Sequence, residues 1–425
     1  MTNAEVMNNF RATRGRTELP DFLARRVERY YRERVRDTWG GHHILHGRTP
    51  GPTAIQIASN DYLALSRHPA ILQATANTLA REGNGLLMSG IFLHGDNPQL
   101  AFERRLANHM QAEAGVLCQS GFCANTGLIQ ALADDSVPVY VDMLAHMSLW
   151  EGIRSAGAQA IVFQHNNPDH LERQIVRNGP GVILVDTVYS TNGSLCPLRE
   201  VADISARRNC VVVADESHSL GTHGPNGEGL VVELGLAGQI QFRTASLAKA
   251  FAGRAGFIAC PERFTEYFKF ESLPAIFSST LLPHEVSGLS ATLDVIVQEG
   301  WRRERLHANS AYLRGGLDAL GYNLNDSQSQ IVSLEAGSEP KTMVLRDALE
   351  SRGIFGSVFC APATPKQRAM VRLSLHCSLT QNDLDRILQV CGEIRPEVEF
   401  DQWPSTRRKN QEARTKTSHR EMVTA

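Results

Sequence analysis

The sequence has few cysteines, and they do not form regularly spaced pairs. Its eight cysteines are scattered from residue 118 to residue 391, and no two of them form a CxxC pair. Zinc sites and the disulfide frameworks of small secreted proteins both need regular cysteine spacings. We therefore expect no metal site and no disulfides, and a reducing cytoplasm is the simplest location.

A surplus of either charge is also missing. The chain has 43 basic and 45 acidic residues, which gives a net charge of -2 at pH 7. Electrostatic binding to nucleic acid or to anionic membranes usually needs a strong basic excess. The N-terminus lacks a basic region followed by an apolar stretch, and no uninterrupted apolar run is long enough to span a bilayer. We expect a cytoplasmic enzyme for small molecules, with neither nucleic acid nor membrane as a partner.

The sequence does contain a regular alternation of short apolar runs and helical patterns. The apolar runs that we expect to form strands are 139–141, 160–163, 182–185, 211–213 and 256–259. Such nearly all-apolar strands are typical of a mainly parallel sheet that helices cover on both faces. A chain of 425 residues is long enough for this α/β domain and a smaller second domain.

The predicted organisation has four parts. They are an N-terminal helix and arm at residues 1–60, a large domain at 61–295, a small domain at 296–400 and a tail at 401–425. The apolar spacing predicts an amphipathic helix that begins at Asp21, and one long helix from Glu285 that stops near Gly315. The tail is charged and poor in apolar residues, so we expect it to be disordered.

Lys249 and Asp215 point to a specific cofactor. Asp215 follows an apolar run, and Lys249 follows the hydroxyl-rich turn after the next predicted strand. Pyridoxal phosphate needs both groups, because a lysine amine forms a Schiff base with its aldehyde and a carboxylate keeps its pyridine nitrogen protonated. A lone aspartate after a strand is more often a helix cap or an ion-pair partner, but the distance to Lys249 favours the cofactor. We predict that both residues are catalytic and bind pyridoxal phosphate.

A candidate phosphate site lies at a strand-to-helix junction. Ser120, Gly121 and Phe122 stand between an apolar run and a helical pattern. Backbone amides at a helix start bind anions, and glycine allows a close approach. Ser246, three residues before Lys249, offers a hydroxyl to the same phosphate. An ordinary turn and a helix cap are the alternative interpretations.

Two histidines and a serine follow predicted strands at the same sheet edge. His146 is placed to stack on the pyridine ring, and His218, three residues after Asp215, is placed to reach its phenolic oxygen. Ser190 could donate to that oxygen as well. We predict that His146 and His218 are catalytic; a core histidine and an inert loop histidine are the alternatives.

Arg372 and Asn60 are candidates for substrate binding. Arg372 interrupts an apolar predicted strand, and a fixed guanidinium is the natural partner of a substrate carboxylate. A buried ion pair is the alternative explanation. Asn60 could supply an amide from the N-terminal segment, although asparagine is also common in turns.

Taken in order, these motifs resemble the α-oxoamine synthases, the fold-type I pyridoxal phosphate enzymes that condense an amino acid with an acyl-CoA. The matching segments are 59–63, 120–122, 142–148, 215–218, 246–249, 277–280 and 372–375. The resemblance covers about residues 20 to 400. It implies an α/β fold of the aspartate aminotransferase type, with a mainly parallel seven-stranded sheet in the large domain and a smaller α+β domain. It also implies a homodimer with active sites at the interface, in which Ser279 and Thr280 reach the phosphate bound by the other subunit.

Within this family the chain is most similar to the branch that makes α-hydroxyketone quorum-sensing autoinducers. Ala248 stands where relatives usually have glycine, and residues 85–90 lack the arginine usual in the family. The resemblance implies an acyltransferase that joins S-adenosylmethionine or 2-aminobutyrate to a medium-chain acyl-CoA. Decarboxylation would then give an α-aminoketone, the precursor of the autoinducer. Lys249 would remove the Cα proton of the amino acid.

Two other functions stay open. The same cofactor site would serve another α-oxoamine synthase, such as 8-amino-7-oxononanoate synthase, 2-amino-3-oxobutyrate CoA ligase or serine palmitoyltransferase. The other is a catalytically silent protein or regulator that binds pyridoxal phosphate, against which the intact Lys249, Asp215 and His218 argue. Acyl-chain length depends on how side chains such as Leu86, Met88, Phe92 and Phe359 pack.

Overall fold

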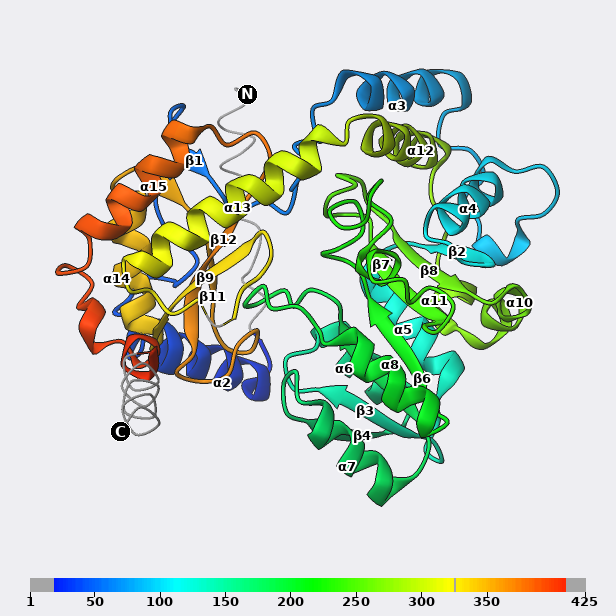
Figure 1. Cartoon of the computed structure of the whole chain (residues 1–425), viewed down its shortest axis with the longest axis horizontal. Helices are drawn as coiled ribbons and strands as arrows, with labels where there is room; N and C mark the ends of the chain where they lie inside the picture. The colour runs from blue at the N-terminus through cyan, green and yellow to red at the C-terminus, as the bar shows by residue number, and fades with distance from the viewer. Residues whose placement is uncertain (1–18, 325, 410–425) are drawn as a thin grey trace, which may run out of the picture.

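The computed structural model describes residues 19–324 and 326–409, which form two lobes (Figure 1). The larger lobe contains a seven-stranded sheet, and the smaller lobe contains a three-stranded sheet. Helix α13 (Trp301–Ala319) runs across the smaller lobe, and its N-terminal end points towards the larger one.

The large sheet has the strand order β2-β8-β7-β6-β5-β3-β4. Its strands are β2 (Ala114–Cys118), β3 (Pro138–Asp142), β4 (Gln159–Phe163), β5 (Val182–Asp186), β6 (Val211–Asp215), β7 (Phe242–Ser246) and β8 (Gly256–Cys260). Strands β4, β3, β5, β6 and β7 pair in parallel, whereas β8 is antiparallel to both β2 and β7. The predicted mainly parallel seven-stranded sheet is therefore confirmed.

Helices cover both faces of this sheet. Val139 and Val141 of β3 pack in one apolar cluster with α5 (Gly121–Leu132) and α6 (Met147–Ser155). Tyr140, between them in sequence, packs in a second cluster with α7 (Pro168–Asn178) and α8 (Leu198–Arg207). Strand side chains alternate between faces, so the central strands β5 and β6 are largely buried, whereas the edge strand β4 is mostly exposed. The carboxyl ends of the parallel strands are thus the edge at which a ligand can bind.

Further helices surround this core. They are α3 (Pro69–Glu82), η2 (Gly90–Phe92), α4 (Pro98–His109), α9 (Leu230–Glu233), α10 (Glu262–Glu271), α11 (Leu273–Ile276) and α12 (Pro283–Gln298). Helices α3 and α12 lie side by side at the top of Figure 1. No helix in the described part of the chain is both long and apolar enough to cross a membrane.

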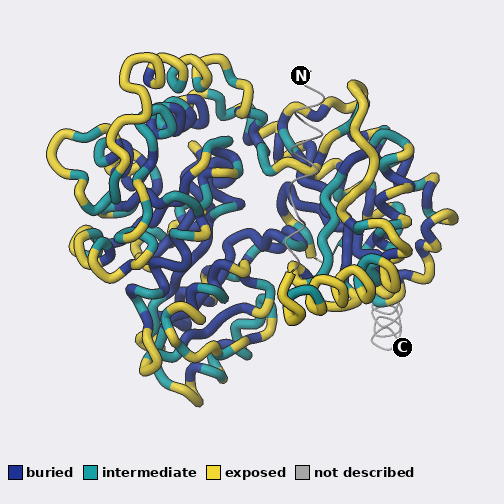
Figure 2. The backbone as a smooth tube through the Cα atoms, turned by 180° about the vertical axis from the view of Figure 1, so that it is seen from behind, coloured by how far each residue is buried: buried dark blue, intermediate teal, exposed yellow. Residues whose placement is uncertain are grey.

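The smaller lobe is an antiparallel sheet of order β11-β12-β9 with helices on it. Its elements are α2 (Asp21–Tyr30), η1 (Tyr31–Arg36), β1 (Ile55–Gln56), β9 (Ile331–Gly337), α14 (Glu339–Glu350), β10 (Ile354–Phe355), β11 (Ser357–Phe359), β12 (Ala369–Ser374), α15 (Gln381–Glu393) and η3 (Phe400–Gln402). The N-terminal arm joins this lobe, because β1 pairs with β10 in parallel. The amphipathic helix predicted to begin at Asp21 is present as α2, whose surface is largely exposed (Figure 2).

The single long helix predicted from Glu285 is wrong, because α12 and α13 are separate helices. The chain leaves the helical conformation at Glu299, whose carboxylate accepts from Arg302 Nε at 2.7 Å and contacts His68 Nε2 at 3.1 Å. Helix α13 then continues past Gly315. At Gly316 a Cβ would lie 2.4 Å from Leu388 Cδ1 of α15, so this glycine lets the two helices pack closely.

The packed chain also extends beyond the predicted start of the tail at residue 401. Trp403 is buried, donates from Nε1 to the carbonyl of Val398 at 2.8 Å, and packs on the rings of Phe400 and Tyr322. One buried indole anchors this segment despite its charged surroundings. Residues 410–425 of the predicted tail lie outside the described residues. The division at residues 60, 295 and 400 stays a prediction.

Candidate active site

Two cavities lie at the carboxyl ends of the large sheet. The smaller, about 230 Å³, is lined by Ser120, Gly121, Phe122, Asn125, His146, Ser148, Asp186, Asp215, Ser217, His218, Ser246 and Lys249. The larger, about 500 Å³, includes Asn60, Ser190 and Arg372 in its wall, together with side chains of the smaller lobe. His146, His218 and Lys249 line both cavities. Every predicted site residue except Ser279 and Thr280 is therefore brought to one place.

Asp215, at the end of β6, is buried and held by two donors. Asn125 Nδ2 donates to its Oδ2 at 2.7 Å, and the backbone amide of Ser217 donates to its Oδ1 at 2.8 Å. Asn125 is itself fixed by Thr244, whose hydroxyl donates to Asn125 Oδ1 at 2.5 Å. The carboxylate thus has a defined orientation towards the smaller cavity.

Lys249 lies half-buried in the turn that follows β7. Burial lowers the pKa of its amine, and the nearby positive charge of Arg372 lowers this pKa further, against the opposing effect of Asp215. A lysine in such surroundings holds more neutral amine near pH 7 than an exposed lysine does. It can therefore act as a nucleophile and as a base.

His146 is connected to Asp215 through a short polar chain. The second Nδ2 proton of Asn125 reaches Ser148 Oγ at 2.8 Å, and Ser148 Oγ lies 2.7 Å from His146 Nδ1. Because Asn125 donates to Ser148, the serine hydroxyl is left to donate to Nδ1, which places the ring proton on Nε2. Burial lowers the pKa of His146, so a neutral ring faces the cavities.

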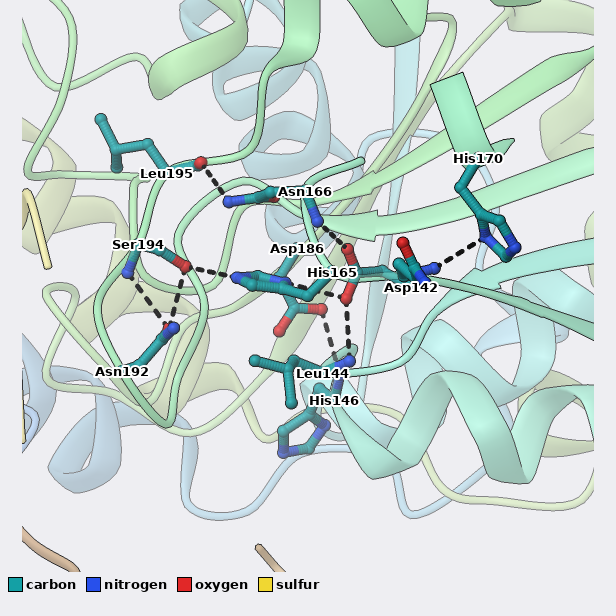
Figure 3. A network of polar contacts seen from close by, with 11 residues as sticks. Asp142, Leu144, His146, His165, Asn166, His170, Asp186, Asn192, Ser194 and Leu195 are labelled. Atoms are coloured by element: carbon teal, nitrogen blue, oxygen red, sulfur yellow. Dashed lines mark hydrogen bonds and ion pairs between the residues drawn. The ribbon is translucent and has the colours of Figure 1, made fainter. Parts of the chain in front are cut away.

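A second network of polar contacts supports the backbone of the segment that contains His146 (Figure 3). Asp186 Oδ1 accepts the amide of His146 at 3.1 Å, and burial raises the pKa of Asp186 well above its ordinary value. Asp142 accepts the amide of Leu144 and contacts His165 Nδ1 at 3.0 Å. His165 Nε2 lies 2.9 Å from Ser194 Oγ, so this network ties the His146 segment to the loop after β5, which carries Ser190.

His218 is buried and lies 2.7 Å from the hydroxyl of Tyr62 through Nδ1. Burial lowers the pKa of this imidazole well below its ordinary value, and Lys249 and Arg372 add to the effect. Burial also raises the pKa of Tyr62 to about 12, so the phenol stays protonated. The Tyr62 hydroxyl also donates to Asn60 Oδ1 at 3.1 Å, so Tyr62 links His218 to Asn60, the candidate substrate-binding residue.

A cradle forms where the start of α5 meets the end of β7. A Cβ at Gly121 would lie 2.6 Å from Ser246 Cβ, so only glycine fits at this position. The Ser120 hydroxyl caps the helix by accepting the amide of Cys123 at 3.1 Å. The first amides of a helix have no acceptor within the helix, so those of Gly121 and Phe122 are available for an anion.

Arg372 of β12 is 4% exposed and has no carboxylate partner within the described residues. Its Nη1 donates to the carbonyl of Ser190 at 2.7 Å, and its Nη2 donates to Asn60 Oδ1 at 2.8 Å. The guanidinium lies 4.5 Å from the ring centre of Phe359, and its buried Nε has no hydrogen-bond partner. The alternative of an internal ion pair is therefore wrong, and a positive charge is held ready for an anionic ligand.

Ser279 and Thr280 lie apart from these cavities. The carbonyl of Ser279 accepts from Gln119 Nε2 at 2.7 Å, and the Thr280 hydroxyl donates to Gln99 Oε1 at 2.5 Å. Neither residue lines the two cavities of its own chain. Their predicted contact with the other subunit stays a prediction.

Some residues of the site were not predicted from the sequence. Asn125 follows Gly121 by one helical turn, so an asparagine on that face of an otherwise apolar helix could have been noticed. Tyr62 contacts His218, and Glu335 lines the larger cavity. Both come from segments that only tertiary packing brings to the site. Of the side chains expected to limit acyl-chain length, only Phe359 lines the larger cavity; Leu86 and Phe92 are exposed elsewhere.

Comparison with known proteins assigns this site to a family. Residues 52–390 match the family model described as aminotransferase class I and II. The chain belongs to this family. It is 46% identical over 384 residues to a CAI-1 autoinducer synthase of Vibrio campbellii, a match that covers 90% of this chain and 98% of that protein. It is 29% identical to 8-amino-7-oxononanoate synthase 1 of Bacillus velezensis, with 82% and 90% covered.

The fold of this family member also matches solved structures. A serine palmitoyltransferase from S. paucimobilis, with a bound PLP-myriocin aldimine, aligns with a TM-score of 0.79 at 24% identity, over 89% of this chain and 98% of that one. The predicted α-oxoamine synthase family, fold class, enzyme class and pyridoxal phosphate cofactor are confirmed.

Proposed function

We propose that this α-oxoamine synthase condenses S-adenosylmethionine or 2-aminobutyrate with a medium-chain acyl-CoA. Loss of carbon dioxide then gives an α-aminoketone, the precursor of an α-hydroxyketone quorum-sensing signal. The 46% identity to a CAI-1 autoinducer synthase supports this choice within the family. The observation that carries the chemistry is that Lys249 lines the same cavity as Arg372, which is buried and has no carboxylate partner among residues 19–324 and 326–409.

The residues of the smaller cavity fit pyridoxal phosphate. Gly121 lets the start of α5 approach Ser246 closely, so the first amides of this helix and the Ser246 hydroxyl lie at one cavity, where a phosphate can bind. In this assignment Lys249 would carry the cofactor, Asp215 would pair with its ring nitrogen, and His146 would cover the ring. His218 and Ser190 would contact its phenolic oxygen, and Ser120, Gly121, Phe122 and Ser246 would hold its phosphate. When bound there, pyridoxal phosphate supplies an electron sink for negative charge at the substrate Cα.

Arg372 and Lys249 then divide the work on the amino acid. The guanidinium of Arg372, fixed by Ser190 and Asn60, binds the substrate carboxylate and so orients the Cα bonds. Once the substrate amine holds the cofactor in place of Lys249, the Lys249 amine would be free to act as a base. Its lowered pKa allows its Nζ to take the Cα proton near neutral pH.

The remaining steps follow from the bonds that must change. The electron pair left at Cα forms a bond to the thioester carbonyl carbon, and the carbon–sulfur bond breaks as the coenzyme A thiolate leaves. The carboxylate is then lost as carbon dioxide, and its electron pair at Cα takes a proton from the Lys249 ammonium. One amino acid and one acyl-CoA thus give one aminoketone, one coenzyme A and one carbon dioxide.

The proposal extends to assembly and location. A homodimer would bring Ser279 and Thr280 to the phosphate of the partner subunit, which is supported by their position outside the cavities of their own chain. All eight cysteines are unpaired, which supports a location in the reducing cytoplasm.

The test combines a spectrum with product analysis. The purified protein should take up pyridoxal phosphate and absorb at roughly 400 to 430 nm, and Lys249→Ala should lose this band. Mass spectrometry should then detect aminoketone from S-adenosylmethionine or 2-aminobutyrate with medium-chain acyl-CoA. Ketone from glycine or alanine alone would contradict the autoinducer assignment and favour another α-oxoamine synthase.

A further inference from the structure

A third hollow, about 660 Å³ in volume, lies behind the wall of the larger cavity. It is a groove between the N-terminal arm and the segment that includes β11. Most of its lining is apolar, as Tyr30, Trp39, Ile44, Leu45, Val358 and Phe359 illustrate. The groove shares Phe359, Pro362 and Ala363 with the larger cavity. A thin partition of three residues therefore separates a catalytic cavity from a large apolar groove.

Most polar groups that line this groove have hydrogen-bond partners, and Arg34 Nε, which has none, is buried away from the groove surface. Arg34 Nη2 donates to Glu339 Oε1 at 2.9 Å, and Trp39 Nε1 donates to Glu339 Oε2 at 2.7 Å. The hydroxyl of Tyr30 lies 3.0 Å from His43 Nε2. What remains for a ligand is apolar surface, so an apolar chain is the matching occupant.

The groove is preformed rather than assembled around a ligand. Glu339, at the start of α14, receives both Arg34 and Trp39 and so fixes the arm to the smaller lobe. Trp39 and Ile44 are buried in its floor, whereas Tyr30 is 41% exposed and Leu45 is 58% exposed on its rim. Exposed apolar side chains gathered around a hollow mark a binding surface more often than a solvated one.

Phe359 lies at the junction of the two spaces. One side of its ring contacts the guanidinium of Arg372 at 4.5 Å, the group that we assign to the substrate carboxylate. The larger cavity must hold the amino donor together with the thioester, so a medium-length acyl chain needs further apolar space. We infer that the acyl chain passes the Phe359 partition into the groove, and that the groove sets the preferred acyl-chain length. This inference rests on the proposed function and specifies its substrate site.

Two variants narrow or polarise the groove without touching the cofactor site. Leu45→Asp places a charge on the exposed rim, and Val358→Trp fills the groove beside the partition. Val176→Asp is the matched control, because Val176 is 63% exposed on α7 and lines none of the three spaces. The measurement is kcat/KM of the full-length holoenzyme with saturated acyl-CoAs from butanoyl to dodecanoyl.

Burial of each methylene should raise kcat/KM by about fourfold over the lengths that reach the groove. Leu45→Asp and Val358→Trp should flatten this rise, lowering kcat/KM for decanoyl-CoA by about tenfold or more while leaving butanoyl-CoA nearly unchanged. Val176→Asp should show the same dependence of kcat/KM on acyl-chain length as the unmodified enzyme. The inference is overturned if both groove variants keep that profile or lose activity equally at all lengths. It is also overturned if Met143→Asp, at a residue that lines the larger cavity but not the groove, abolishes the rise instead.

A binding experiment separates this inference from the proposed function. Inert S-alkyl-CoA thioethers of graded length can be titrated by calorimetry without turnover. A length-dependent affinity that Leu45→Asp removes supports the groove even if no acyl-CoA yields ketone, in which case the proposed function alone fails. An affinity independent of chain length overturns the groove assignment whatever the enzyme produces.

Discussion

Replacing Arg372 with methionine should separate stability from function. The guanidinium is buried without a carboxylate partner in the described chain, so the folded protein bears the cost of desolvating a charge, which is several kcal/mol. Methionine removes this cost but also removes the bonds to Ser190 and Asn60. Hydrogen bonds of a charged group contribute about 1.5–3 kcal/mol each, so the two changes nearly cancel.

The effect on substrate binding has no such compensation. Loss of a buried charged partner of a carboxylate costs about 2–5 kcal/mol, which corresponds to roughly 30- to 5,000-fold in kcat/KM for the amino donor. We therefore expect Arg372→Met to lower kcat/KM by at least about 30-fold, with the free energy of unfolding of the cofactor-free protein within about 2 kcal/mol of the original. The cofactor absorbance should remain, because Arg372 does not line the smaller cavity.

Urea unfolding of the cofactor-free protein and steady-state kinetics with varied amino donor make this test. Arg372→Lys is the control, since it keeps the charge but loses the bidentate geometry, and it should recover only part of kcat/KM. A large loss of stability combined with an unchanged KM for the amino donor would show that Arg372 does not bind the substrate carboxylate. Arg372 would then be a structural residue.

Three further predictions follow from the cofactor cavity. The added Cβ of Gly121→Ala would lie 2.6 Å from Ser246 Cβ. This variant should therefore lower the free energy of unfolding by about 1–3 kcal/mol and weaken pyridoxal phosphate binding in a titration. An unchanged stability and an unchanged affinity would contradict the close approach of Gly121 to Ser246. Folding lowers the pKa of Lys249 below its ordinary value of 10.5, so at pH values just below 10.5 the unfolded chain binds more protons than the folded protein does. The free energy of unfolding of the cofactor-free protein should therefore increase as the pH rises towards 10.5. In urea unfolding, Lys249→Met should reduce this increase in the free energy of unfolding with pH. The same slope against pH in the variant and the unmodified protein would contradict a lowered pKa of Lys249. In the third experiment, inactive Lys249→Ala subunits are mixed with subunits that carry Ser279→Ala and Thr280→Val. If Ser279 and Thr280 serve the active site of the partner subunit, the mixed dimers should regain activity. No recovery would show that these two residues act elsewhere.

The parts of the site that follow strands were predictable from the sequence. Apolar runs such as 211–213 fix where a parallel strand ends, and the polar residue after each run, such as Asp215, is brought to the shared edge of the sheet. The order of these motifs along the chain then indicated that the residues form one site. The seven-stranded sheet was predictable for the same reason.

Other features depend on contacts that no local pattern encodes. Tyr62 reaches His218 across 156 positions of sequence, and Glu299 interrupts a continuous helical pattern because it pairs with His68 and Arg302. Trp403 holds a charged segment that composition alone indicated to be disordered. In each case a tertiary contact outweighs the local preference.

The stoichiometry of a single turnover tests the central claim most directly. The holoenzyme would be mixed with acyl-CoA and an amino donor labelled with ¹³C in its carboxylate, and coenzyme A, labelled carbon dioxide and ketone would be quantified together. We expect equal amounts of coenzyme A, labelled carbon dioxide and ketone from the unmodified enzyme, and none from Lys249→Ala. Coenzyme A released without labelled carbon dioxide, or a keto acid formed from the amino donor without coenzyme A release, would contradict the central claim.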